Sequence, residues 1–134
     1  MKPFPWRPRM AATSSLSPYI LTAIVVRDGM ALCSFNVEVT GAEYVRAEWF
    51  RLADLKPDED DPATLGALLG VVREVWSAPL AQVTPWLSWD HLRRMNVVDG
   101  WRVCLNDATD RRCPPNERAE SEFAALLAAY QEAP

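Results

Sequence analysis

The chain has 134 residues, a hydrophobic content of 49%, a charged content of 24% and a formal net charge of −4 at pH 7. These values are typical of a globular domain that is long enough to bury a core without disulfide bonds. The negative charge argues against general nucleic-acid binding, and no run approaches the roughly 18 apolar residues of a membrane span.

The three cysteines, Cys33, Cys104 and Cys113, are odd in number and unrelated in spacing, so they predict no disulfide framework. Basic residues precede an apolar run near the start of the chain, but Pro18 interrupts that run. No small-residue cleavage motif follows it, which argues against a signal peptide. We therefore expect a reducing, cytoplasmic environment.

Residues 1–17 contain prolines at positions 3, 5 and 8, which exclude a helix there. We predict a flexible, proline-rich N-terminal arm over residues 1–17 and a single α+β domain over residues 18–134. Two alternatives stay open for the arm. The PxxP spacing of residues 5–8 is typical of a recognition peptide, and Phe4 and Trp6 could instead attach the arm to the domain.

Residues 19–39 are expected to seed the fold. Two β-rich runs flank Asp28-Gly29, a pair that suits the positive φ angles of a type I′ turn. The second run alternates and predicts a strand with one solvated face, whereas the first is apolar on both faces and predicts a covered central strand. Residues 42–55 fit a helix or a strand, and their aromatic and β-branched side chains favour a third antiparallel strand.

A helix is predicted directly after the acidic run of residues 58–61. Asp61 suits the N-cap position, a proline follows it, and apolar side chains recur at helical spacing over residues 65–76. Gly66 and Gly70 lie four residues apart in this helix. Because each weakens a helix, we expect another backbone to pack closely against them.

Two further helices and a second hairpin are predicted in the remaining sequence. A Thr-Pro start and helical spacing predict a short helix within residues 84–95, and Asp99-Gly100 predicts a hairpin over residues 97–105. Whether that hairpin joins the first sheet is open. Asn116 is expected to cap a last helix. The predicted fold is α+β: an antiparallel sheet of three to five strands, seeded by the hairpin 19–39, packed against two longer helices and one short helix.

Catalytic motifs are missing from the sequence. It has no phosphate-binding glycine loop, HExxH, GxSxG or paired CxxC, and we predict neither a metal nor a cofactor. One alternative is a small enzyme that uses His91, the only histidine, with a cysteine or an aspartate. Adjacent helix residues such as Asp90 and His91 would not face one another, and a zinc site from His91, Cys104 and Cys113 lacks the usual paired spacing.

Two segments are candidate binding surfaces. The chain has six tryptophans, and residues 86–112 interleave tryptophan with arginine, the side chains that dominate binding hot spots. The acidic run at residues 58–61 could contact a basic partner or be a solvated lead-in to its helix. The predicted partner-binding residues are Asp58, Glu59, Asp60, Asp61, Trp86, Trp89, Arg93 and Arg94.

These features predict a non-catalytic protein-binding module whose partner is another protein, one that presents a basic surface to the acidic run. By analogy of size and charge with immunity proteins and phage-encoded inhibitors of bacterial defence, we expect an inhibitor, a neutraliser or an adaptor. A second alternative is a protein that contacts nucleic acid through residues 86–112 by base stacking and phosphate contacts.

Overall fold

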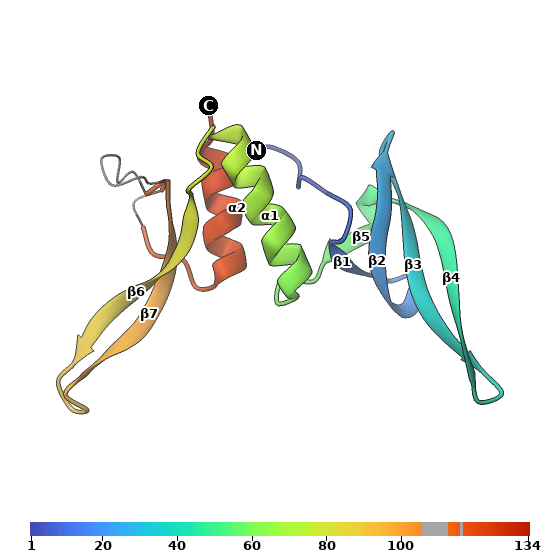
Figure 1. Cartoon of the computed structure of the whole chain (residues 1–134), viewed down its shortest axis with the longest axis horizontal. Helices are drawn as coiled ribbons and strands as arrows, with labels where there is room; N and C mark the ends of the chain where they lie inside the picture. Colours follow the sequence, from blue (N-terminus) through green and yellow to red (C-terminus); the bar gives the residue numbers. More distant parts are fainter. Residues whose placement is uncertain (106–112, 116) are drawn as a thin grey trace. The chain divides into compact units, whose positions relative to one another are not determined.

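A computed structural model describes residues 1–105, 113–115 and 117–134 of the chain (Figure 1). The chain divides into two compact units. One unit contains residues 4–67, and the other contains residues 1–3 together with residues 68–134. Helix α1 (Pro62–Val75) crosses from one unit to the other along the sequence.

The unit of residues 4–67 is built on a five-stranded antiparallel sheet with the strand order β4-β3-β2-β1-β5. A 3-10 helix over Leu52–Asp54 connects its last two strands in sequence. The strands are β1 (Ala11–Ser14), β2 (Ser17–Arg27), β3 (Met30–Val39), β4 (Ala42–Arg51) and β5 (Leu55–Pro57).

Two tight turns determine the pairing of the three longest strands of this sheet. Asp28 (φ 52°) and Gly29 (φ 74°) connect β2 to β3, and Thr40 (φ 50°) and Gly41 (φ 82°) connect β3 to β4. Positive φ at both turn residues matches the right-handed twist of the flanking strands. The predicted hairpin and the predicted third strand are therefore confirmed.

One face of this sheet forms the core of the unit. Alternate residues of β3 from Ala31 to Val37 are buried, as the sequence pattern predicts. β2 lies between two strands, but the prediction that both of its faces are covered is wrong, because Ile20 and Ile24 are 62% and 45% exposed. The physical reason is that an antiparallel sheet can bury one face and leave the other in water.

The segment that we expected to be a flexible arm contains β1. This strand pairs with both β2 and β5, and Met10 and Trp6 beside it are buried. The Ala11 amide donates a hydrogen bond of 2.8 Å to Thr64 Oγ1. Its sequence, AATS, consists of small residues with no strand signature, so pairing partners rather than local preference hold it in place.

The start of α1 follows the sequence prediction. Asp61 Oδ2 accepts hydrogen bonds from the amides of Ala63 (3.0 Å) and Thr64 (3.1 Å), as an N-cap residue does. The prediction of a close backbone contact at the helix glycines is wrong. A Cβ atom added to Gly66 or Gly70 would meet no other atom within 4 Å among the described residues.

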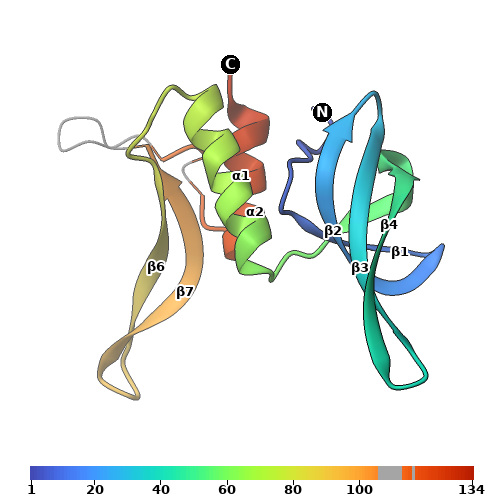
Figure 2. The same cartoon turned by 45° about the vertical axis from the view of Figure 1, so that its right-hand side comes forward.

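The other unit contains a two-stranded antiparallel sheet and helix α2. The sheet is a long hairpin of β6 (Gln82–Asp90) and β7 (Met95–Cys104), and α2 (Glu122–Glu132) packs against its base (Figure 2). Ser121 Oγ caps α2 by accepting from the Ala124 amide at 3.0 Å. The cap predicted at Asn116 lies outside the described residues.

The predicted fold, one sheet packed against three helices, is wrong. The described part of the chain has seven strands in two antiparallel sheets and only two α-helices, not one sheet with three helices. The predicted short helix within residues 84–95 is instead most of β6, the turn that follows it and the first residue of β7. Pro85 is compatible with a strand here because a two-stranded sheet leaves one side of each strand without a pairing partner.

The predicted turn at Asp99-Gly100 is also wrong, because both residues lie inside β7. Gly100 has a φ of 148°, and a Cβ atom on it would lie 3.0 Å from both Ala119 O and Arg118 Cβ. Trp101 and Ala119 exchange backbone hydrogen bonds beside it, at 2.9 and 2.8 Å. The glycine is therefore needed for the close approach of a second chain segment, not for a hairpin turn.

Candidate binding surface

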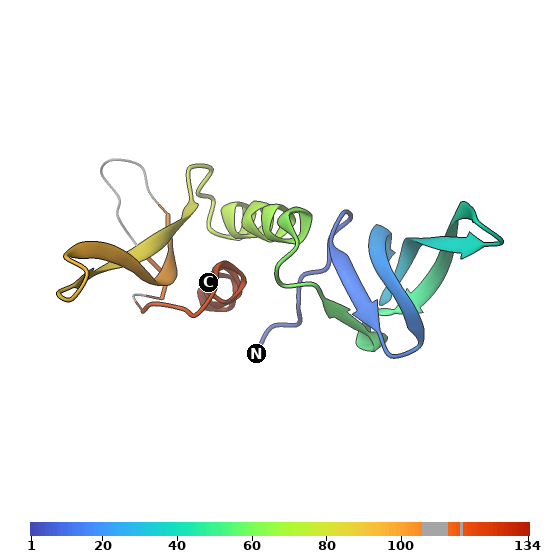
Figure 3. The same cartoon turned by 90° about the horizontal axis from the view of Figure 1, so that it is seen from below.

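The outer half of the β6–β7 hairpin exposes large apolar side chains. Figure 3 shows that this end of the hairpin extends away from α2. Leu87 and Val98 lie directly opposite one another, and Trp89 follows Leu87 on the same face. We call the exposed residues of this half the hairpin surface: Leu87, Trp89, Leu92, Met95 and Val98 are all more than half exposed.

The hairpin turn places two arginines at the end of this surface. Asp90 Oδ1 accepts from the amides of Leu92 (3.0 Å) and Arg93 (3.2 Å), and its other oxygen lies 3.7 Å from Arg93 Nε. Arg94 adopts a positive φ of 53°. The carboxylate of Asp90 orders this turn. The backbone that carries the exposed side chains of Arg93 and Arg94 therefore has a defined conformation.

Trp86 is in a different setting from the other predicted anchors. Its ring lies under the guanidinium of Arg102, with 5.1 Å between Arg102 Cζ and the ring centroid. Both side chains are half-buried, and Arg102 Nε has no hydrogen-bond partner among the described residues. Trp86 is therefore engaged in a cation–π contact within the hairpin, whereas Trp89 is 52% exposed.

The acidic run contributes to the local structure that precedes α1. Asp61 caps the helix, and Asp58 Oδ1 accepts from the Asp60 amide at 3.2 Å. Glu59 and Asp60 expose their side chains. The run belongs to the unit of residues 4–67, and the hairpin surface belongs to the other unit.

His91 lies in the exposed turn of the hairpin, where its ring is 6.4 Å from that of Trp89. Cys104 lies at the opposite end of the hairpin, paired with Gln82. At about 3.3 Å per strand residue, roughly 30 Å of strand separates His91 from Cys104, so these residues form neither a nucleophilic pair nor a zinc site. Among the described residues, no group of three His, Cys, Asp or Glu side chains is arranged to hold a metal ion.

The structure brings Cys104 and Cys113 together, a contact that sequence reasoning missed. Their sulfur atoms are 2.9 Å apart, and Thr84 Oγ1 lies 3.6 Å from Cys104 Sγ. Burial, followed by the hydrogen bond and charge of Cys104, raises the pKa of Cys113 from 9.0 to about 11. A raised pKa keeps this thiol protonated at neutral pH, which does not suit a nucleophile.

Comparison with protein-family models, with curated proteins and with solved structures finds no match. Neither helix of the described chain has the length and hydropathy that a bilayer-spanning segment requires.

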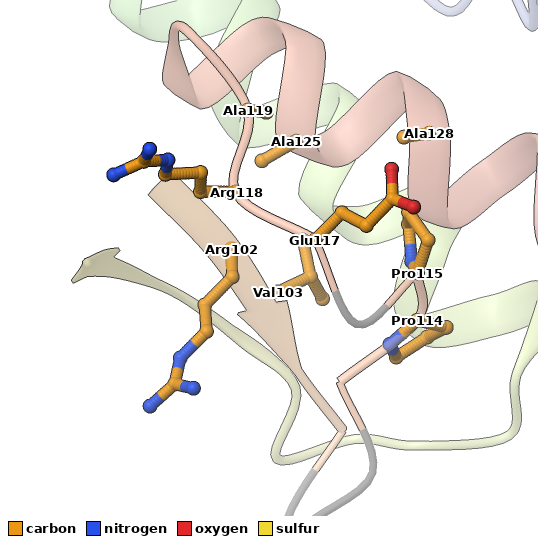
Figure 4. Close-up of a pocket in the computed structure, with 9 residues that line it drawn as sticks. All are labelled: Arg102, Val103, Pro114, Pro115, Glu117, Arg118, Ala119, Ala125 and Ala128. Atoms are coloured by element: carbon orange, nitrogen blue, oxygen red, sulfur yellow. The ribbon is translucent and has the colours of Figure 1, made fainter. Parts of the chain in front are cut away.

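A pocket of about 110 Å³ lies between β7, α2 and the segment that connects them (Figure 4). Most of its lining is apolar. In the close-up, Arg102 points away from the other lining residues, and Glu117 is the one carboxylate among them. The residues that line this pocket include no nucleophilic side chain beside a base. The lining residues are Arg102, Val103, Pro114, Pro115, Glu117, Arg118, Ala119, Ala125 and Ala128.

Proposed function

We propose that this protein is a non-catalytic protein-binding module and that the hairpin surface is its main contact. The observation that carries the proposal is the exposure of five large apolar side chains on one hairpin, ending in Arg93 and Arg94. Three of them, Leu87, Trp89 and Val98, share one face of the hairpin, and exposed apolar surface of this kind marks interaction sites on proteins. Tryptophan and arginine are also the side chains on which binding energy concentrates.

The form of the hairpin supports the proposal. An isolated two-stranded hairpin is marginally stable in water, and hairpins usually bury one face. Here α2 packs against the base of the hairpin, whereas the side chains of Leu87, Trp89 and Val98, farther out, are exposed. Retaining these apolar side chains in water lowers solubility, which is consistent with a surface that a partner covers.

Within this class we propose an inhibitor, neutraliser or adaptor, on the analogy of size and charge given above. The exposed carboxylates of Glu59 and Asp60 would supply a second contact, to a basic surface of the partner. Asp58 and Asp61 already accept backbone hydrogen bonds at or just before the start of α1. Glu59 and Asp60 are therefore the stronger candidates for an electrostatic contact with a partner.

The proposal is tested by affinity capture from the native host with wild-type protein and two matched variants. Trp89→Ala removes the central aromatic of the hairpin surface, and Leu80→Ala removes an exposed apolar side chain of the same unit outside the hairpin. We expect one stoichiometric partner that Trp89→Ala loses and Leu80→Ala retains. For a hot-spot tryptophan, affinity for the purified partner should fall by roughly thirtyfold or more.

The alternatives give different outcomes in the same series. An enzyme that depends on His91 would lose its activity in His91→Ala, whereas the binding module would keep its partner. Binding of nucleic acid at low salt, with a steep fall as salt rises, would favour the nucleic-acid alternative instead. A partner that binds Trp89→Ala as tightly as wild type would contradict the hairpin surface as its contact.

A further inference from the structure

Strand β4 is a long edge strand of the five-stranded sheet. It pairs with β3 on one side through ten residues in unbroken register and is the last strand of the sheet on the other (Figure 1). Proteins usually protect such edges with charged side chains, proline, a bulge or a short strand. The sequence of β4, AEYVRAEWFR, has no proline and its register contains no bulge, so its protection consists of the charged residues Glu43, Arg46, Glu48 and Arg51. Such charges repel a strand of like charge pattern but attract one that presents opposite charges.

The backbone of β4 presents a regular row of hydrogen-bonding groups at this edge. In a two-residue hairpin the pair flanking the turn, here Val39 and Ala42, exchanges both backbone hydrogen bonds, and bonding residues then alternate along the strand. The Leu52 amide donates to Gly29 O at 2.9 Å, in agreement with that alternation. The odd-numbered residues from 43 to 51 therefore direct their N–H and C=O groups to the open edge.

The charges along β4 are complementary to those of a second copy. In an antiparallel pair of two β4 strands centred on Ala47, residues equally far before and after Ala47 lie opposite one another. Arg46 then faces Glu48 of the other copy, and Glu43 faces Arg51. Each contact occurs twice across a two-fold axis, which gives four pairs of opposite charge.

The apolar side chains match in the same register. Val45 and Trp49 are 74% and 44% exposed, and they lie opposite one another across the axis. Trp49 is paired with Leu32 on β3, and the Arg27 guanidinium covers its ring at 5.2 Å. A second copy would therefore extend an existing row of side chains across the sheet, as cross-strand pairs do.

Other registers lose this match. Facing side chains share a side of the sheet, so a symmetric pair must be centred on one residue. A pair centred on Arg46 or on Glu48 places two like charges directly opposite one another, which is destabilising. A pair centred on Val45 or on Trp49 places the charged residues Arg46 and Glu48 opposite uncharged ones. Only the register centred on Ala47 pairs every charge with its opposite.

We propose that β4 is a homodimerisation strand, through which two copies of this chain join their five-stranded sheets into one continuous antiparallel sheet. The dimer also relieves a repulsion inside each chain. Glu38 and Glu43 are directly opposite one another on β3 and β4, and like charges in that position are unfavourable. Arg51 of the second copy would lie beside Glu43 and compensate that charge.

The mass of the full-length protein in solution is the first test. Sedimentation velocity or native mass spectrometry of the 15.1 kDa chain should show a concentration-dependent species of twice that mass. The proposal is wrong if the protein stays monomeric at every concentration. It is also wrong if β4 pairs only with a strand of another protein.

Charge reversal tests the register. Arg46→Glu places a glutamate opposite Glu48 of the second copy, and Glu48→Arg places an arginine opposite Arg46 of the second copy. Each variant alone should dimerise roughly tenfold more weakly or worse, because like charges now face each other. Mixing the two single variants should restore dimerisation as a heterodimer, since every facing pair then has opposite charge.

The mixed sample separates the interface from effects on folding. Both single variants lose the intrachain contact between Arg46 and Glu48, which is 3.7 Å long, so its loss cannot explain recovery on mixing. Lys56→Glu, an equal charge reversal on β5 at the other edge of the sheet, should leave the dimer unchanged. Single variants that dimerise like wild type, or a mixture that does not recover, would overturn the register and the proposal with it.

Discussion

Cys104 and Cys113 show how a contact between two residues changes the chemistry of a side chain. Separated by eight residues in sequence, their sulfurs lie 2.9 Å apart at the base of the hairpin. Burial and the neighbouring thiol both disfavour the thiolate of Cys113, so its pKa is about 11. Burial also raises the pKa of Cys33, whose thiol donates to Ala31 O at 3.8 Å.

The raised pKa of Cys113 predicts slow alkylation. Below pH 9 the thiolate fraction of a group with a pKa of about 11 is about a hundredfold smaller than that of a thiol with a pKa of 9.0. Peptide mass spectrometry after timed iodoacetamide treatment at pH 8 should show this deficit, and the rate should keep rising with pH to about 11. Cys104→Ser should accelerate the alkylation of Cys113, because it removes the neighbouring thiol that helps to raise the pKa of Cys113. Rapid alkylation of Cys113 in the wild-type protein at pH 8 would contradict the assignment.

At the scale of elements, Gly100 determines how β7 receives the segment before α2. We predict that Gly100→Ala lowers the free energy of unfolding by about 1 to 3 kcal/mol, because a Cβ at a φ of 148° is strained and meets Ala119 O and Arg118 Cβ at 3.0 Å. Urea denaturation followed by circular dichroism measures the change.

Gly70→Ala is the matched control for that substitution. Space is open around Gly70 in α1, so alanine there should raise the stability by up to about 1 kcal/mol through its helix propensity. Equal effects of the two substitutions would mean that the local geometry of Gly100 has no role.

The elements predicted correctly are those whose signals are local. The turns at Asp28-Gly29 and the cap at Asp61 depend on a few adjacent residues, and both appear in the structure. The strand β1 could not be predicted, because its pairing with β2 and β5 depends on distant segments. Asp99-Gly100 has the sequence of a turn, but a segment of chain about twenty residues away determines its conformation.

Composition suggests Trp89, Arg93 and Arg94 as binding residues, which stays a prediction, but it does not reveal their arrangement. Trp89 lies on β6, and the two arginines lie in the turn that follows it. Their spacing fits a helix as well as a strand, since Trp86, Trp89 and Leu92 recur every third residue. Short apolar runs often carry this ambiguity, and here the pairing of β6 with β7 decides it. The charges of β4 alternate in sign in the sequence, but they predict pairing with a second copy only because β4 is an edge strand.

At the scale of the whole molecule, Lys2 holds the start of the chain against α2. Its amide donates to Gln131 Oε1 at 2.8 Å, and Gln131 Nε2 donates back to Lys2 O at 2.9 Å. The ammonium group donates to the carbonyls of Tyr130 (3.1 Å) and Ala133 (2.5 Å) at the end of the helix. A cation there donates to carbonyls that lack helical partners and interacts favourably with the negative end of the helix dipole.

We predict that Lys2→Ala destabilises the unit of residues 68–134 by about 1 kcal/mol, since the ends of helices gain about that much from a cation. Hydrogen exchange with mass spectrometry should show faster exchange in the last turn of α2 and unchanged protection in β3. Lys56→Ala, the other lysine of the chain, should change neither. Faster exchange in β3 as well would contradict a local role for Lys2.

The contact between Lys2 and α2 also has a consequence for biosynthesis. Residues 1–3 belong to a unit that otherwise consists of residues 68–134, and the whole of the other unit is translated between them. A ribosome adds about 5 to 20 residues each second, and domains form as their residues emerge. The unit of residues 4–67 can therefore fold on the nascent chain, whereas Lys2 has no partners until residues 130–133 have also been synthesised.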